Sequence, residues 1–390
     1  MSVLRLVMVT PRYWPLVGET ERFASHLAVG LRPHVETTVL TARWSSDWPA
    51  DVRHRETPVV RLPSAPRGGW GTFRYARSVA RWLRHHQREV DVVYAMNLRQ
   101  DAWAATRALR GARTAIVLRA QGGDCRWLET VPWGRRLRHW TCQADAIVAP
   151  ARAVARELES AGHGRPPIHV IANGVEAAAP RTAALRYQAR LALAEANPDL
   201  AAAEYAPVAV SVGSLEDRSS LFALVEAWRP IAARWPSAKL WLLGDGPVRQ
   251  PLYERIVDRG LHRQVLLPGT FDDLSDVFYA ADLFVAWGAV CDGGQFLLEA
   301  MAAGLPVVAA DTEAHRELVA HGAHGLLVPR GVGAALAEAI GALLADPARG
   351  ARCGENARRR VLQGFTPARM AGEHRDLFQR IVERKRRGVP

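Results

Sequence analysis

Short apolar runs alternate with amphipathic stretches along the whole chain. In the first half, these runs predict buried strands at residues 3–10, 37–42, 91–96, 114–120, 146–150 and 168–172. In the second half they predict strands at residues 208–214, 239–244, 265–268, 283–287, 306–310 and 325–328. The runs are continuously apolar, which is typical of strands that are covered on both faces of a sheet.

Stretches with helical periodicity separate the predicted strands, for example at residues 21–31, 72–87, 151–160, 221–233, 247–259 and 332–344. A last helix is predicted to start at Thr366 and Pro367, a favoured N-cap residue followed by proline at the first helical position. Strands that alternate with helices indicate βαβ units and parallel sheets. We therefore expect an α/β fold of doubly wound, Rossmann-like sheets, in which ligands bind beyond the carboxyl ends of the strands.

One segment interrupts this rhythm and indicates a domain boundary. Residues 177–205 are rich in Ala and Arg and contain Pro180 and Pro198, but no clear strand. A chain of 390 residues also exceeds the size at which a single core stops growing, about 250–300 residues. The expected organisation is an N-terminal domain, a linker, a C-terminal domain, and a final helix with a basic tail, over residues 1–178, 179–206, 207–365 and 366–390.

The positive charge of the chain is concentrated in its first half. The whole sequence has 51 Lys and Arg against 39 Asp and Glu, which gives a net charge of +12. Residues 1–180 hold 26 of these cations and 15 of the acids, whereas residues 181–390 are nearly neutral. The asymmetry indicates that the first domain faces something anionic, such as a membrane surface or an acidic acceptor.

Two arginine clusters carry much of that charge. One follows a predicted helical stripe and the other lies near Trp133 and Trp140; together they comprise Arg74, Arg77, Arg81, Arg84, Arg135, Arg136 and Arg138. Basic amphipathic helices with interfacial tryptophans suit an anionic membrane surface. A solvated arginine face is the alternative interpretation. Nucleic acid is not expected as a partner, because no recognised binding motif accompanies the charge.

The cysteines and the apolar segments bear on metal binding and location. The four cysteines do not have the spacing of metal ligands, so we expect no metal site. The most apolar stretch, residues 297–310, is interrupted by Glu299, Gly304 and Pro306 and is shorter than the about 20 residues that a membrane span needs. The N-terminus does not resemble a signal peptide. The expected location is the cytoplasm, with the inner face of the membrane as a second candidate.

Residues 292–311 contain the strongest candidate chemistry. Gly293 and Gly294 open a predicted helix directly after a strand, where backbone N–H groups and the helix dipole would suit a phosphate. Glu299 follows on an otherwise apolar stretch of that helix, and a ribose diol is a good bidentate partner for its carboxylate. The alternative is a carboxylate at the rim of the helix that binds water or an arginine.

Two weaker motifs lie at other strand ends. Gly244 and Gly246 stand where a predicted strand passes into a helix, and glycines there let a ligand approach the backbone. For such a motif alone, a tight strand-to-helix turn is the commoner reason. Asn173 and Gly174 follow the last predicted strand of the first domain and indicate a turn.

Taken in order, these motifs resemble the retaining GT-B glycosyltransferases of family 4. The most specific block is Leu-Glu-Ala-Met-Ala-Ala-Gly-Leu-Pro-Val at residues 298–307. The other blocks are weak singly, but they follow the order of the family along nearly the whole chain, at residues 15–18, 21–22, 173–175, 212–213, 244–247, 281–285, 317–319 and 325–329.

The resemblance implies a GT-B fold, in which two Rossmann-like domains face each other across a cleft and the final helix crosses back to the first domain. It implies transfer of a hexose from a nucleotide sugar to a glycan, lipid-linked or small-molecule acceptor, with retention of anomeric configuration and without a metal or other cofactor. The implied donor-binding residues are Glu299, Gly293, Gly294, Gln295, Phe296, Gly213, Ser214, Ser219, Gly244, Gly246 and Gly18. The implied catalytic residues are Asp292, Gln121 and Arg218, and those on the acceptor side are Arg119, Asp124 and Asn97.

Five positions depart from the family pattern. Glu19 replaces a glycine at the diphosphate, Ser214 and Ser219 replace its clamping Arg and Lys, Gln121 replaces a His, and Cys291 replaces a Glu. Charge-assisted hydrogen bonds are worth about 1.5–3 kcal/mol each, so losing two cations beside a diphosphate predicts slow transfer. The alternative function is therefore a catalytically impaired GT-B protein that acts as a nucleotide-binding or scaffold partner.

Overall fold

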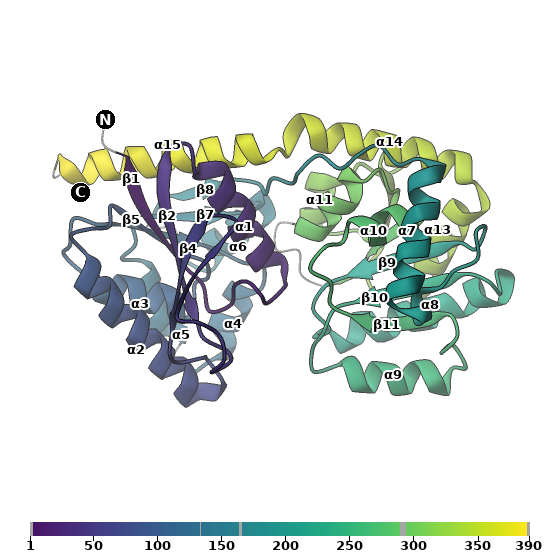
Figure 1. The fold of residues 1–390 in the computed structure, drawn as a ribbon, viewed down its shortest axis with the longest axis horizontal. Coiled ribbons are helices and arrows are strands. Elements are labelled where there is room, and N and C mark those ends of the chain that lie inside the picture. The colour runs from purple at the N-terminus through teal and green to yellow at the C-terminus, as the bar shows by residue number, and fades with distance from the viewer. Residues whose placement is uncertain (1–2, 133, 164–165, 289–293, 388–390) are drawn as a thin grey trace. The chain divides into compact units, whose positions relative to one another are not determined.

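The computed structural model describes residues 3–132, 134–163, 166–288 and 294–387. The chain divides into two compact units (Figure 1). Unit 1 holds the residues up to Leu16, Thr20–Gly174 and the residues from Pro367 onward, and unit 2 holds Val17–Glu19 and Val175–Thr366. Each unit is built on its own sheet, which confirms the α/β class expected from the sequence.

Unit 1 contains an eight-stranded sheet with the order β3-β4-β2-β1-β5-β6-β7-β8. Its strands are β1 (Leu4–Val9), β2 (Val35–Ala42), β3 (Asp51–His54), β4 (Thr57–Leu62), β5 (Val92–Ala95), β6 (Ala115–Arg119), β7 (Ala146–Ala149) and β8 (Ile168–Val170). Neighbouring strands run parallel, except for the antiparallel β3–β4 hairpin at one edge. The six strands predicted for this half are confirmed, and the hairpin is additional.

Unit 2 contains a six-stranded parallel sheet with the order β11-β10-β9-β12-β13-β14. Its strands are β9 (Val208–Val212), β10 (Lys239–Leu243), β11 (Val265–Gly269), β12 (Leu283–Ala286), β13 (Val307–Ala310) and β14 (Gly325–Val328). All six were predicted. Because β9 lies between β10 and β12, the direction in which strands are added reverses between β9 and β12.

Helices connect successive strands in both units. The helices that pack in unit 1 are α1 (Glu19–Leu31), α2 (Gly68–His86), α3 (Gln100–Ala108), α4 (Asp124–Thr130), α5 (Gly134–Thr141), α6 (Arg152–Ser160) and α15 (Pro367–Arg386). Those of unit 2 are α7 (Ala183–Ala196), η1 (Pro198–Leu200), α8 (Arg218–Arg234), α9 (Arg249–Asp258), α10 (Ser275–Ala280), α11 (Gln295–Ala302), α12 (Glu313–Leu318), α13 (Gly333–Ala345) and α14 (Pro347–Gly364).

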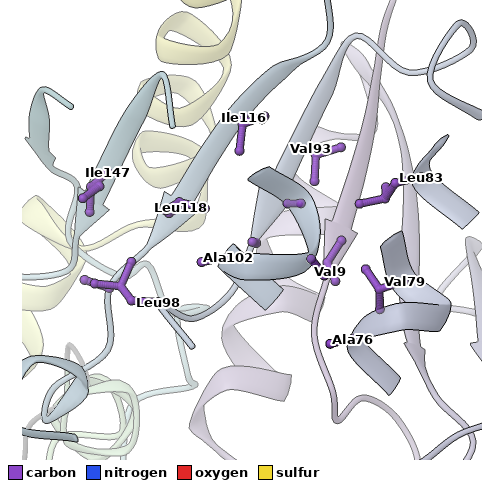
Figure 2. Packing of buried hydrophobic residues seen from close by; sticks show 14 of the residues in the cluster. Val9, Ala76, Val79, Leu83, Val93, Leu98, Ala102, Ile116, Leu118 and Ile147 are labelled. Carbon is purple, nitrogen blue, oxygen red and sulfur yellow. The ribbon is translucent and has the colours of Figure 1, made fainter. Parts of the chain in front are cut away.

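Helices cover both faces of the first sheet. On one face, Val79 and Leu83 of α2 pack among strand residues that include Val9 and Val93 (Figure 2). On the other face, Phe23 of α1 and Phe378 of α15 belong to a second buried cluster. Burial on both faces explains why the strand sequences are continuously apolar.

Ion pairs join the basic C-terminal end of α15 to the first sheet. Lys385 Nζ lies 2.8 Å from a carboxylate oxygen of Asp145, just before β7, and also donates to the carbonyl of Thr114. Arg386 Nη2 lies 3.1 Å from Asp91, just before β5. The cations at the end of α15 therefore hold the helix at the amino edge of the sheet.

Residues 179–206, expected as a linker, fold as part of unit 2. Helix α7 packs against α10, and three arginines converge on the carboxylate of Asp282 at distances of 2.8–3.0 Å: Arg181, Arg186 and Arg190. The backbone N–H of Val208 donates to the same carboxylate. Burial favours a higher pKa for Asp282, but the arginines outweigh it and hold the pKa below its ordinary value.

We predict that Asp282→Asn lowers the free energy of unfolding by about 2–4 kcal/mol, because the three guanidinium groups lose their common anion. The depressed pKa means that this stabilisation is present above about pH 4 and is lost as the pH falls through the folded-state value. Urea titrations between pH 3 and 7 measure both effects. Asp258→Asn, an exposed control on α9, should change little; equal effects of the two variants would contradict the prediction.

Candidate functional site

A hollow of about 70 Å³ opens in unit 2 where β9 and β12 end. Its wall is formed by the ends of β9 and β10, the loop and first turns of α8, and Trp287 and Gly288 after β12. The polar side chains that line it are Ser211, Ser214, Asp217 and Ser220. This is the point where the strand order reverses, which is the preferred ligand position in doubly wound sheets.

Asp217 begins helix α8 and shapes one wall of the hollow. Its carboxylate accepts a hydrogen bond from the backbone N–H of Ser220 at 3.2 Å and one from the Ser220 hydroxyl at 2.7 Å. Burial acts to raise the pKa of Asp217, but these bonds and the charge of Arg330 bring it below its ordinary value. Asp217 is therefore an anion engaged in capping the helix.

The positions where the family pattern has a diphosphate clamp lie beside this hollow. Ser214 lines it, whereas Ser219 is exposed in the first turn of α8. The guanidinium of Arg218, proposed to replace the missing lysine, lies 4.9 Å from the ring centre of Phe222 and is not part of the wall. The positive charge of Arg330, which follows β14, acts on Asp217 in this wall.

At positions 244 and 246 the backbone packs so closely against a neighbouring loop that a side chain would clash. Gly244 has φ +144°, and a Cβ there would lie 1.9 Å from the carbonyl oxygen of Gly213. A Cβ on Gly246 would lie 2.5 Å from the carbonyl oxygen of Leu215. The backbone N–H of Leu215 donates to the backbone carbonyl of Asp245, so the loop after β9 and the loop after β10 stabilise each other. The tight-turn alternative thus accounts for both glycines, and the turn they form supports the wall of the hollow.

Helix α11 presents its amino end after the segment 289–293. Gly294 stands before the helix in the left-handed region, at φ 62°. Gln295 Nε2 donates to Glu299 Oε1 at 2.9 Å, and Glu299 is half-buried. Phe296 is a core residue of unit 2, so its side chain packs internally. Cys291, Asp292 and Gly293 lie outside the described residues.

Gln121 ties together three loops at the carboxyl edge of the first sheet. Its Nε2 donates to the Thr20 hydroxyl at 2.7 Å and to the carbonyl of Met96 at 2.8 Å. Its backbone N–H donates to Asp124. Gly18 and Glu19 lie at the start of α1, directly before Thr20. Gln121 is thus held in place with its amide donors already engaged.

Asp124 and Asn97 form a buried network under the same loops. Asp124 accepts hydrogen bonds from the backbone of Leu98 and from Arg99 Nε at 2.8 Å. Burial raises the pKa of Asp124, and the neighbouring Arg99 offsets part of that rise. Asn97 donates to the fully buried Asp101 at 2.6 Å. Both residues expected on the acceptor side therefore have structural partners.

Arg119 is buried at the end of β6. Its guanidinium lies 3.9 Å from the ring centre of Phe23, and its Nη2 donates to Asn173 Oδ1 at 3.0 Å. The amide nitrogen of Asn173 is buried without a hydrogen-bond partner. The structure therefore brings together Arg119 and the Asn173 turn, two features that are far apart in the sequence.

The sequence did not indicate several residues of the hollow. Asp217 and Ser220 had a detectable signal, since Asp three residues before Ser at a helix start is a capping pattern. Trp287 and Arg330 had none, because they reach this point only through the pairing of strands. Gly213, by contrast, was predicted and lines the hollow.

Two family models match the chain, one in each half. The model described as "Glycosyltransferase Family 4" matches residues 20–179, and the one described as "Glycosyl transferases group 1" matches residues 206–346. Together with two doubly wound sheets, the matches define the class as GT-B glycosyltransferases. The chain is a GT-B glycosyltransferase of the family 4 type.

Individual relatives come from bacterial glycan and metabolite synthesis. The lipopolysaccharide core biosynthesis glycosyltransferase LpsE of Rhizobium meliloti is 33% identical over 161 residues, which are 41% of this chain and 46% of LpsE. N-acetyl-alpha-D-glucosaminyl L-malate synthase of Bacillus anthracis is 22% identical over 71% of each chain. The match to LpsE thus spans about half the length of that relative.

The fold is shared with solved glycosyltransferase structures. Anabaena Alr3699/HepE in complex with UDP and glucose superposes with a TM-score of 0.77 at 20% identity, covering 96% of this chain and 99% of HepE. Sucrose-phosphate synthase of Thermosynechococcus elongatus gives 0.77 at 19% identity, over 97% and 99%. At these identities the likeness establishes the fold alone.

We predict that Gly244→Ala lowers the free energy of unfolding by about 2–4 kcal/mol, because the new Cβ meets the Gly213 carbonyl and φ is unfavourable. Gly213→Ala is the matched control, since a Cβ there meets nothing within 4 Å. Urea unfolding of both variants tests the difference. If Gly244→Ala is as stable as Gly213→Ala, the two loops do not pack as described.

Proposed function

We propose that the protein transfers a sugar from a nucleotide-sugar donor during glycan synthesis. The observation that carries this proposal is the hollow between the ends of β9 and β12, at the reversal point of the second sheet. Doubly wound sheets bind nucleotides at such points. Helix α8 also begins there, and its N-cap Asp217 fixes the loop that forms one wall of the hollow.

The finer parts of the proposal are a hexose donor, retention of anomeric configuration, and transfer without a metal ion or other cofactor. They are supported by the match to the family 4 model and by the resemblance of residues 298–307. HepE, which shares the fold, binds UDP-glucose. A nucleoside diphosphate hexose is therefore the donor class to test first.

We assign roles to residues on this basis. Glu299, oriented by Gln295, would bind the ribose diol, and Gly294 at the start of α11 would admit the phosphates. In unit 1, Gln121 would contact the acceptor or the transferred sugar, and the buried Arg119, expected on the acceptor side, would position the Asn173 turn. Because the amide donors of Gln121 are engaged, its Oε1 is the atom that would accept a sugar hydroxyl.

The proposed acceptor is a glycan or lipid-linked saccharide. An anionic membrane surface is proposed as a second partner, through the arginines expected from the sequence: Arg74, Arg77, Arg81, Arg84, Arg135, Arg136 and Arg138. All of these are exposed except Arg138, which is half-buried and donates to the carbonyl of Ala161 at 2.8 Å. The lipopolysaccharide role of LpsE supports an acceptor of this class.

We predict that the protein binds one of UDP, GDP or ADP, or one of their hexose conjugates, in calorimetric titrations. Glu299→Ala should weaken that binding about 10- to 100-fold, since a hydrogen bond to a charged group is worth about 1.5–3 kcal/mol. Glu338→Ala, an exposed carboxylate on α13, is the matched control and should leave affinity unchanged.

Two results would count against this assignment. Equal affinity of Glu299→Ala and wild type would remove Glu299 from the donor site. Binding to none of the six ligands would favour the scaffold alternative, in which Glu19, Ser214, Ser219 and Cys291 have closed the site. Where transfer is detected, the anomeric proton coupling of the product tests retention.

A further inference from the structure

Helices α2, α3 and α5 form one layer on the first sheet. Helix α2 packs against α3, and α3 packs against α5 (Figure 1). Their apolar sides, with Ala76, Val79, Leu83 and Ala102, face the strands (Figure 2). The layer therefore joins on one surface the two arginine clusters that are separate in the sequence.

The exposed side of this layer is rich in arginine, and we call it the basic face. It carries seven exposed arginines from three helices: Arg74, Arg77, Arg81, Arg84, Arg107, Arg135 and Arg136. The sequences of α2 and α5 contain no Asp or Glu. The one acid of α3, Asp101, is fully buried. The carboxylates nearest in sequence are Glu89, beyond the end of α2, Glu129 on α4, and Asp145 after α5, which pairs with Lys385.

Exposed aromatic side chains stand at one end of the basic face. Trp70 is 72% exposed and Phe73 is 44% exposed. Their rings stack on each other, with centres 5.6 Å apart and planes inclined by 25°. Phe73 also contacts Trp103 of α3. The guanidinium carbon of Arg107 lies over that Trp103 ring, 5.6 Å from its centre. The aromatic group thus connects α2 to α3 and remains accessible.

The aromatic pair and the arginines share one stripe of α2. Trp70, Phe73, Arg77, Arg81 and Arg84 follow each other at intervals of three or four residues, which places them on one side of the helix. This order puts an apolar anchor at the start of the stripe and cations along the rest. It is the side-chain distribution of a helix that lies in the head-group region of a membrane.

We propose that the basic face docks on an anionic phospholipid bilayer, with Trp70 and Phe73 inserted among the head groups and the arginines bound to lipid phosphates. The inference rests on the anionic membrane surface proposed above as a partner. It adds Trp70 and Phe73 as an apolar anchor and α3 as a third helix of the surface. Among the described residues, every helix is too short or too polar to span a bilayer, so the proposal concerns the surface of the membrane.

Charge and shape favour lipid over the other possible occupants. A second copy of this chain would set like charges against each other, because the basic face carries no exposed carboxylate on its helices. The phosphates of a DNA duplex would suit the arginines, but its bases are already stacked and would leave the Trp70–Phe73 pair in water. Membrane interfaces favour both arginine and tryptophan.

The experiment is co-sedimentation with vesicles of neutral phosphatidylcholine and of phosphatidylcholine with phosphatidylglycerol. We expect binding to the anionic vesicles only. Arg77→Glu/Arg81→Glu/Arg84→Glu should weaken it at least about 100-fold, since each basic residue near the surface adds about a factor of five to ten. Trp70→Ser/Phe73→Ser should weaken it about 10-fold or more and leave a residual, salt-sensitive binding.

Matched controls lie in unit 2. Arg229→Glu/Arg263→Glu/Arg352→Glu makes the same change of net charge at exposed positions, and Tyr253→Ser/Val257→Ser removes an exposed apolar pair from α9. Neither should change vesicle binding. If the controls weaken binding as much as the basic-face variants, the effect is one of total charge and the proposal fails.

Other outcomes would overturn the proposal as well. These are absence of vesicle binding, tighter binding to a DNA duplex than to vesicles, and a dimer that Trp70→Ser/Phe73→Ser dissociates. Nucleotide titration of the same variants separates the two proposals. The basic face is remote in sequence from the donor site, so intact nucleotide binding with lost vesicle binding assigns the defect to the membrane surface.

Discussion

The strand order of the second sheet creates the gap around which the loops of unit 2 are packed. Because β9 lies between β10 and β12, the loops that leave β9 and β12 turn to opposite faces and leave a gap at their carboxyl ends. The hollow lined by Ser214, Asp217 and Trp287 occupies this gap. The glycines at 244 and 246 and the cap at Asp217 then serve one purpose, which is to keep these loops close together without filling the gap.

Polar residues at the carboxyl edge of the first sheet hold its loops together, and the same residues are the proposed contacts for a sugar. Gln121, Asp124 and Asn97 each engage a neighbouring loop, and two of them are almost completely buried. Such bonds fix the loops, but they reduce the number of donors and acceptors that are left for a sugar. In the proposed function, the acceptor contacts come from atoms that the network leaves available, such as Gln121 Oε1, or from residues that the network positions.

The sequence predicted most of the fold because the strands of both sheets are continuously apolar. It missed the β3–β4 hairpin, whose turn uses Arg55 and Glu56 at positive φ, where glycine or asparagine would have given a signal. It also missed α7 as part of unit 2, because the ion pairs between its arginines and Asp282 join residues about a hundred positions apart. In the site, the glycine turns were predictable from spacing, whereas Trp287 and Arg330 depend on tertiary pairing.

Arginine has three distinct uses in this chain, and they explain why net charge alone says little about partners. Arg181, Arg186 and Arg190 surround one carboxylate and stabilise unit 2. Arg99 and Arg119 are enclosed by partners at the edge of the first sheet. The arginines of the basic face instead combine exposure, helices without exposed carboxylates and adjacent aromatic rings. A charge excess becomes a candidate binding surface where neighbouring acids are missing, whereas the arginines around Asp282 are already neutralised within the fold.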